Sequence, residues 1–254
     1  MSDSLHKAIS ILEALRLSPD GSSARVLAGE TGIPKSTVQR LLQSLAETQM
    51  VVQDPQRLTY RLGPRTLMLG MAYKQGLDLG RLALPVMVEL RNQTNETVGL
   101  SVAVGHERMF IEEAQSLFEL RFASELGRLY PLWSGAPGRA LMIDLNSREV
   151  EEIIGDALPS ASSVHSPVGH DVILARLEHT RLQRHARAFN ETLDNVSSLA
   201  VPIRNARGDV VAALSISGPS ERLTSARMDE VVHDLEAAAF GLSRSLGGLA
   251  ARLA

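Results

Sequence analysis

The chain has 254 residues, 44% hydrophobic and 22% charged, a composition typical of globular proteins with enough apolar material for two cores. It contains no cysteine, which excludes disulfides, thiolate catalysis and cysteine-ligated zinc. The formal charge is +3 through Gly76 and −6 for the remainder, so we expect nucleic acid to bind at the N-terminal end only.

The N-terminal residues predict no secretory signal, because no basic region precedes an apolar core. No uncharged apolar run approaches the about 18 residues that a membrane helix requires. We therefore expect a cytoplasmic protein without a membrane partner.

Helical apolar spacing predicts a first helix over residues 4–17, which ends in the turn Ser18-Pro19-Asp20-Gly21. Ser22 or Ser23 caps the next helix, Ala24–Thr31. After a tight turn at Gly32, a second helix runs from about Pro34 to Glu47. Glycine at the turn and proline at the helix start are typical of a helix-turn-helix.

The helix Pro34–Glu47 has two unlike faces. Its apolar residues recur at the spacing of one buried stripe: Val38, Leu41, Leu42 and Leu45. The opposite face carries groups that hydrogen-bond to phosphates or base edges: Ser36, Gln39, Arg40, Gln43 and Ser44, with Lys35 at the start. This pattern predicts the recognition helix of a DNA-binding head.

A two-stranded wing is expected next, because two β-like runs, Val51–Gln53 and Leu58–Leu62, flank Asp54-Pro55-Gln56. Leu58, Tyr60 and Leu62 alternate with polar residues, as in a half-buried hairpin. Arg57 and Arg61 would contact backbone phosphates, although a solvated strand face is the alternative for both. Gly63-Pro64 ends the hairpin, and Thr66–Leu77 predicts a linker helix.

The remainder alternates strands and helices and predicts an α+β domain with a mainly antiparallel sheet. The expected strands are 98–104, 109–114, 120–124, 198–204 and 209–217. The expected helices are 83–94, 134–145, 148–154, 171–188 and a closing helix capped by Thr224.

Several segments resemble the IclR family of bacterial transcription regulators, in the same order along nearly the whole chain. In the head they are Thr31-Gly32-Ile33-Pro34-Lys35-Ser36-Thr37-Val38-Gln39-Arg40-Leu41-Leu42 and Tyr60-Arg61-Leu62-Gly63-Pro64. Downstream they are Leu126-Gly127-Arg128-Leu129-Tyr130-Pro131-Leu132, Ala136-Pro137-Gly138-Arg139-Ala140-Leu141, Ala200-Val201-Pro202-Ile203 and Val211-Ala212-Ala213-Leu214-Ser215-Ile216-Ser217-Gly218-Pro219. The chain departs from the family at Arg139, where lysine is usual, and at Asn190, where members often have aspartate before Glu191.

The resemblance implies three parts: a winged helix-turn-helix DNA-binding domain (1–64), a linker helix (65–80) and a GAF-like effector-binding and oligomerisation domain (81–254). Double-stranded operator DNA, a small organic effector (a carboxylate or aromatic metabolite) and further copies of the chain would be the partners. The predicted DNA-binding residues are Ser23, Lys35, Ser36, Thr37, Gln39, Arg40, Gln43, Arg57 and Arg61.

Carried over position by position, the resemblance implies an effector pocket lined by Leu126, Leu132, Ala136, Pro137, Glu191, Val196, Ser198, Ala200, Ser215 and Ser217. Part of this set has an independent basis, since Ser215 and Ser217 point to the same face of one strand and need hydrogen-bond partners. A polar effector would supply those partners, and backbone or water is the alternative. A helix that begins near Ser134–Ala136 also presents free N–H groups to an anion.

Catalysis is the competing class of function. The chain has no Gly-x-Ser-x-Gly elbow, Walker A loop, His-Glu-x-x-His or Gly-x-Gly-x-x-Gly, and its carboxylate pairs are adjacent residues whose side chains diverge. The histidines 165, 170, 179 and 185 have poor spacing for a metal site. We therefore expect no enzyme, no metal and no cofactor. The alternative function is a small-molecule sensor whose winged-helix head binds a protein.

Overall fold

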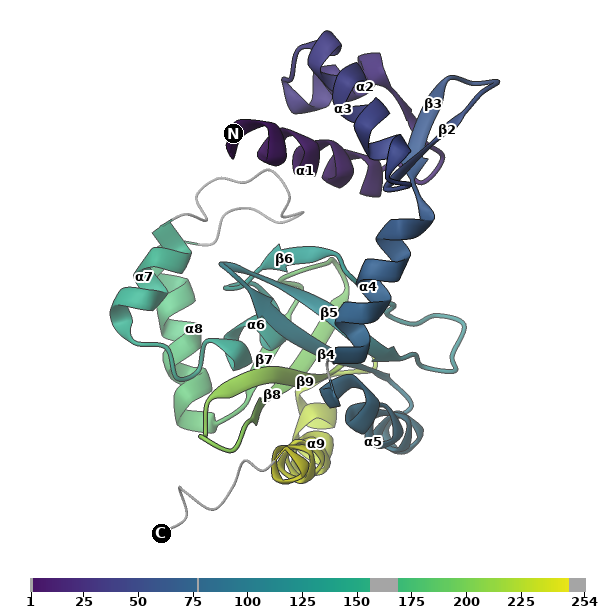
Figure 1. Cartoon of the computed structure of the whole chain (residues 1–254). Helices are drawn as coiled ribbons and strands as arrows, with labels where there is room; N and C mark the ends of the chain where they lie inside the picture. Colours follow the sequence, from purple (N-terminus) through teal and green to yellow (C-terminus); the bar gives the residue numbers. More distant parts are fainter. Residues whose placement is uncertain (1, 77, 156–168, 247–254) are drawn as a thin grey trace. The chain divides into compact units, whose positions relative to one another are not determined.

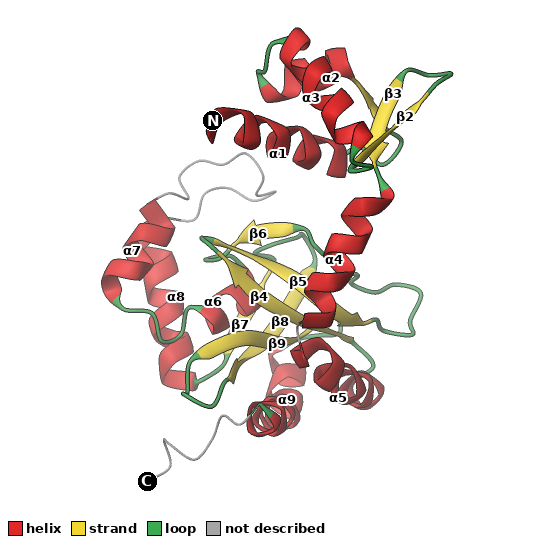
Figure 2. Ribbon diagram, in the orientation of Figure 1, coloured by secondary structure: helices red, strands yellow, loops and turns green. Residues whose placement is uncertain are grey.

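The computed structural model describes residues 2–76, 78–155 and 169–246. The chain divides into two compact units, Met1–Gly76 and Leu77–Ala254, which we call the head and the body. Helices and strands of each unit are labelled in Figure 1 and coloured by type in Figure 2.

The head combines helices with a small antiparallel sheet of order β1-β3-β2. Its elements are α1 (Ser2–Arg16), β1 (Ser22–Ser23), α2 (Ala24–Thr31), α3 (Lys35–Glu47), β2 (Val51–Asp54), β3 (Thr59–Leu62) and α4 (Pro64–Gly76). Side chains from the first three helices and β2 form one core, including Ile11, Leu27, Val38, Leu42 and Val51. The apolar stripe predicted for the helix Pro34–Glu47 thus packs in this core and holds α3 in place.

The body is built on a six-stranded antiparallel sheet of order β6-β5-β4-β9-β8-β7, so the predicted α+β class is confirmed. Its strands are β4 (Thr97–Val104), β5 (Glu107–Ala114), β6 (Leu129–Pro131), β7 (Ala186–Phe189), β8 (Val196–Arg204) and β9 (Val210–Pro219). Its helices are α5 (Asp78–Thr94), α6 (Gly135–Leu141), α7 (Ser147–Gly155), α8 (His170–Gln183) and α9 (Ser225–Ser245).

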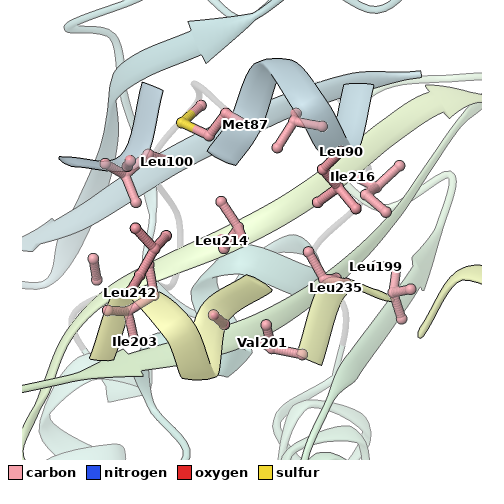
Figure 3. Packing of buried hydrophobic residues seen from close by; sticks show 14 of the residues in the cluster. Met87, Leu90, Leu100, Leu199, Val201, Ile203, Leu214, Ile216, Leu235 and Leu242 are labelled. Carbon is pink, nitrogen blue, oxygen red and sulfur yellow. The ribbon is translucent and has the colours of Figure 1, made fainter. Parts of the chain in front are cut away.

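Helices cover both faces of this sheet, and each face has its own core. On one face α5 and α9 pack over Leu100, Leu199, Leu214 and other alternating strand residues, as Figure 3 shows. On the other face α6, α7 and α8 enclose small residues, among them Ala200 and Ala213. Small side chains there let α6 lie close to the strands, so we call this side the α6 face.

The structure corrects four sequence predictions. Residues 120–124 form no strand; this loop is held instead by side chains, since Thr97 Oγ1 donates to the Phe122 carbonyl at 2.6 Å. The helix predicted over 171–188 ends at Gln183, because Arg184 adopts a left-handed conformation (φ 63°) and the chain then pairs as β7. Leu58 is no strand residue: it lies in the wing turn at φ 53°, 63% exposed. The helix predicted over 134–145 spans only Gly135–Leu141.

None of the helices in the described part of the chain is long and apolar enough to cross a membrane.

Candidate functional sites

The helix-turn-helix of the head is formed by α2, the turn after it and α3. Gly32 ends α2 in the left-handed region (φ 67°), which glycine adopts without steric cost. Pro34 precedes α3 at its N-cap, and its carbonyl accepts hydrogen bonds from the N–H groups of Thr37 and Val38. These two residues fix the direction in which α3 leaves the turn.

The outer face of α3 is free of packing, as its polar sequence predicts. Val38 and Leu42 are fully buried, whereas the predicted contact residues Lys35, Ser36, Gln39, Arg40 and Gln43 are exposed and Thr37 is half-buried. Glu47, the last residue of α3, is the helix's one carboxylate. The face therefore offers hydrogen-bond donors, amides and positive charge, as a recognition helix needs to read base edges and phosphates.

The wing is a hairpin of β2 and β3 whose turn is set by Asp54. Its carboxylate Oδ1 accepts hydrogen bonds from the N–H groups of Gln56 (2.9 Å) and Arg57 (3.1 Å). These backbone hydrogen bonds, that from Arg57 first, hold the pKa of Asp54 below its usual value. Arg57 in the turn and Arg61 on β3 are both exposed, so their side chains can reach a phosphate backbone or water.

Ser23 was predicted both as a possible helix cap and as a DNA contact, and the structure confirms the first role. It is the N-cap of α2, and its hydroxyl accepts a hydrogen bond from Val26 N at 3.3 Å. The side chain is half-buried, and its hydroxyl proton remains able to donate to a phosphate.

Strand register brings part of the predicted effector set together on the α6 face. Ser198 lies opposite Ser217 and Ala200 opposite Ser215, and directly opposed residues share a face of the sheet. Val196 lies two residues before Ser198 on the same strand and so faces the same way. Ser215 donates to the Gly99 carbonyl at 3.3 Å, so this hydroxyl has a backbone partner.

The helix α6 covers this face and packs closely on the turn that leads into it. Leu132, Ala136 and Pro137, three of the residues predicted to line an effector pocket, are buried. A Cβ on Gly138 would lie 1.9 Å from the Leu132 carbonyl oxygen, so only glycine fits. The helix has seven residues, and Pro137 in its first turn lacks an N–H, so fewer backbone donors are available to an anion than the sequence suggested.

Two other predicted effector residues lie in different surroundings. Glu191 accepts a bidentate ion pair from Arg139 and lies 3.3 Å from Arg176, so its charge is already neutralised within the protein. Leu126 is 52% exposed in the loop before β6. The structure groups neither residue with the serines of β8 and β9.

The residue that the sequence prediction missed is Arg108 on β5. It lies opposite Ala103 on the sheet and is 2% exposed. Its guanidinium carbon lies 5.2 Å from the centre of the Phe110 ring and 4.9 Å from that of Tyr130. The signal was its position two residues before Phe110, on the same face of a strand that we predicted to begin two residues too late.

The histidines give no metal centre within the described residues, which contain no group of three or more metal-ligating side chains. His165 lies outside those residues. His170 contacts Glu151 at 2.8 Å, and this hydrogen bond raises the pKa of His170.

Comparison with known proteins covers both units. A model of the IclR helix-turn-helix domain matches residues 4–55, and one of the bacterial transcriptional regulator IclR C-terminal region matches residues 71–244. The HTH-type transcriptional repressor AllR of Salmonella typhimurium is 31% identical over 236 residues, covering 91% of this chain and 86% of AllR. The HTH-type transcriptional regulator KdgR of Escherichia coli K12 is 32% identical over 213 residues, covering 84% of this chain and 81% of KdgR.

Solved structures support the same fold. The crystal structure of an IclR transcriptional regulator from Alicyclobacillus acidocaldarius superposes with a TM-score of 0.82 and covers 97% of this chain and 99% of its own, at 23% identity. The two family matches together cover both the head and the body, and the relatives exceed 30% identity over most of their length. The chain therefore belongs to the IclR family of bacterial transcriptional regulators.

Proposed function

We propose that this protein is a cytoplasmic, sequence-specific repressor that binds an operator as a homodimer or a dimer of dimers and responds to a small organic acid or aromatic metabolite. The observation that carries the proposal is the exposed face of α3, which bears Lys35, Gln39, Arg40 and Gln43 and is held outward by an apolar stripe in which Val38 and Leu42 are fully buried. The relative AllR is a repressor, which supports repression as the outcome.

In the proposed complex, two heads place their α3 helices in successive major grooves of a pseudo-palindromic site. Gln39, Arg40 and Gln43 contact base edges, whereas Ser23, Lys35, Ser36, Thr37, Arg57 and Arg61 position the head on phosphates. Self-association is supported by Leu67, Met68 and Leu69 of α4, each more than half exposed, because an apolar surface of this kind is commonly covered by a partner.

Effector control would act through the chain between head and body. The effector would bind on the α6 face, at Leu132, Ala136, Pro137, Val196, Ser198, Ala200, Ser215 and Ser217, with Leu126 and Glu191 at its margin. Residues 65–80, which include most of α4, would transmit the change and alter the spacing of paired heads. Effector and DNA would each favour one spacing of the heads. Binding of either one would therefore change the affinity for the other by the same free energy.

Replacing Arg40 with alanine tests the DNA interface. If Arg40 reads a base, Arg40→Ala weakens binding to the specific site by about 1–3 kcal/mol, or roughly 5- to 150-fold, with little change on random DNA. Lys7→Ala is the control, because Lys7 is a cation of the same head whose partner is Asp3. Binding to labelled duplexes by fluorescence anisotropy is the measurement. An equal loss on both duplexes would show that Arg40 contacts only phosphate.

A second candidate function is a small-molecule sensor whose head binds a protein. The salt dependence of binding distinguishes this function from DNA binding, because DNA binding releases counterions and weakens steeply as salt is added.

A further inference from the structure

Arg108 is enclosed between the sheet and α6. Its Nε donates to the Ser134 carbonyl at 3.3 Å, just before α6 begins. A Cβ on Gly138 would lie 3.5 Å from Arg108 Cδ, and a Cβ on Gly135 would lie 3.4 Å from Arg108 Nη2. The side chain therefore runs along the underside of α6, where two glycines leave room for it.

Among the described residues, this buried positive charge has no carboxylate partner. Arg108 Nη1 is buried without a hydrogen-bond partner. Burial, opposed by Tyr130 and reinforced by nearby Arg139, lowers the pKa of Arg108 to about 10. At neutral pH the guanidinium is still protonated. Burying an unpaired guanidinium costs free energy, and an anion that pairs with the guanidinium offsets part of that cost.

Arg139, in the same region, is a buried arginine whose charge is paired with a carboxylate. It is also 2% exposed and its Nε is buried without a hydrogen-bond partner, but both of its terminal nitrogens bond to the Glu191 carboxylate, and Nη2 also donates to the Arg187 carbonyl at 2.5 Å. The two residues therefore have the same burial, but of the two only Arg139 is paired with a carboxylate. This contrast makes Arg139 the matched control for Arg108.

The groups around Arg108 fit a planar anion. The rings of Phe110 and Tyr130 lie against the guanidinium, whose Nη1 has no hydrogen-bond partner. Ser101, opposite Phe110 on β4, is fully buried and its hydroxyl has no hydrogen-bond partner. Buried polar atoms of native proteins are nearly always hydrogen-bonded, so unpartnered donors on one face of the sheet point to a ligand.

We propose that Arg108 selects the effector: the ligand of the α6 face is a small organic acid whose carboxylate pairs with the unpartnered edge of the Arg108 guanidinium. A guanidinium forms two parallel hydrogen bonds with a carboxylate, and a neutral amide cannot replace that pairing. The inference rests on the proposed function and specifies the class of its effector. It also gives the body a way to reject neutral analogues of the same shape.

The test compares carboxylic acids with their own amides. The probes are propanoate with propanamide and benzoate with benzamide, at millimolar concentrations and matched ionic strength. The melting temperature of the full chain is measured for the native protein, Arg108→Met, Arg108→Lys and Arg139→Met. For the native protein we expect at least one acid to raise the melting temperature by about 2–4 °C and its amide to leave it unchanged.

The variants separate a ligand-binding role from a structural one. Arg108→Met is expected to lose the response to acid while melting at the native temperature or above it, since an unpaired charge has been removed. Arg108→Lys, which keeps the charge without the planar fork, should respond less than the native protein. Arg139→Met should melt at a lower temperature, because Glu191 then loses its bidentate partner. A drop in the melting temperature of Arg108→Met below that of Arg139→Met would overturn the proposal in favour of a structural arginine.

The remaining outcomes also decide the question. An amide as effective as its acid, an undiminished acid response in Arg108→Met, or no acid that exceeds its amide would each overturn the proposal. Binding to DNA from the chain's own upstream region, measured without acid, distinguishes this failure from that of the proposed function. Arg108→Met should bind that DNA like the native protein, whereas loss of the DNA complex in every protein would count against the regulator itself.

Discussion

Replacing Gly138 with alanine tests the close packing of α6 on the turn that leads into it at Leu132, which holds α6 above Arg108. Gly138 lies inside α6 and Gly241 lies inside α9. Glycine to alanine in an open helical position stabilises a protein by about 0.5–1 kcal/mol through helix propensity. No described atom lies within 4 Å of a Cβ at Gly241, so Gly241→Ala is expected to show this gain alone.

At Gly138 the new Cβ would lie 1.9 Å from the Leu132 carbonyl oxygen and 2.9 Å from its carbon. Cβ atoms essentially never approach a neighbour within 3.0 Å, so α6 or the Leu132 peptide must move by about 1 Å. Overpacking of this kind costs about 1–3 kcal/mol, and backbone contacts cannot rotate away as a side chain can. After the helix gain is subtracted, we expect Gly138→Ala to lose about 1–2 kcal/mol.

The assay is thermal unfolding of the full chain followed by circular dichroism. Gly138→Ala should melt about 2–8 °C lower than the native protein, and Gly241→Ala slightly higher. Operator binding at low temperature should survive in both variants, because the head has its own core. The reasoning is refuted if Gly138→Ala raises the melting temperature as Gly241→Ala does, since α6 would then not lie against the Leu132 carbonyl.

Two further predictions concern charge. The double variant Arg57→Ala/Arg61→Ala should bind specific and random DNA more weakly by similar factors. The slope of log K against log salt should fall in magnitude by about 1 for each lost phosphate contact. An unchanged slope would mean that both arginines are only solvated. Burial lowers the pKa of His185, with Arg187 acting in the same direction and Glu236 opposing, so the unfolded chain binds a proton more readily. The stability that neutral His185 contributes is therefore present above about pH 6.5 and is lost as the pH falls below that value. Between about pH 7.5 and 5.5 the melting temperature should fall more for the native protein than for His185→Gln. Parallel curves of melting temperature against pH would contradict this prediction.

The head could be predicted well because its signals are local. Of the predicted stripe, Val38, Leu41 and Leu42 are buried and Leu45 is half-buried, and the helix bounds differ from the structure by only one or two residues. Gly32 and Pro34 mark the turn by their own backbone preferences. The prediction that Leu58 lies in a strand was wrong, because the hydrogen bonds to Asp54 shape the turn and Leu58 belongs to that turn.

In the body, long-range contacts decided what local patterns could not. Arg184 ends α8 in a left-handed conformation that its residue type does not favour, and β7 exists because Ala186 and Ala188 pair with β8. The loop that replaces the strand predicted over 120–124 is held by Thr97, about 25 residues away in sequence. Likewise, the partner of Glu191 is Arg139, 52 positions earlier, and no local pattern joins the two.

The missed Arg108 shows how a strand start predicted two residues too late hides a buried charge. We predicted β5 from Met109, which left Arg108 beside the turn and therefore among solvated residues. The strand begins at Glu107, and alternation then places Arg108 inward beside Phe110. An arginine at an inward position of a strand is rare enough to be a signal once the register is known.

The central claim is that α3 and the wing hold DNA and that the body controls how firmly. Its most direct test is titration of the full chain into a labelled fragment of its own upstream region, between roughly 50 and 200 mM salt, with and without the carboxylic acids above. With Lys35, Arg57 and Arg61 of two heads on phosphates, we predict a complex whose log K falls with log salt at a slope of about −5, and whose affinity changes when an effective acid is added. Absence of any complex at the lowest salt, with or without the acids, would contradict the account.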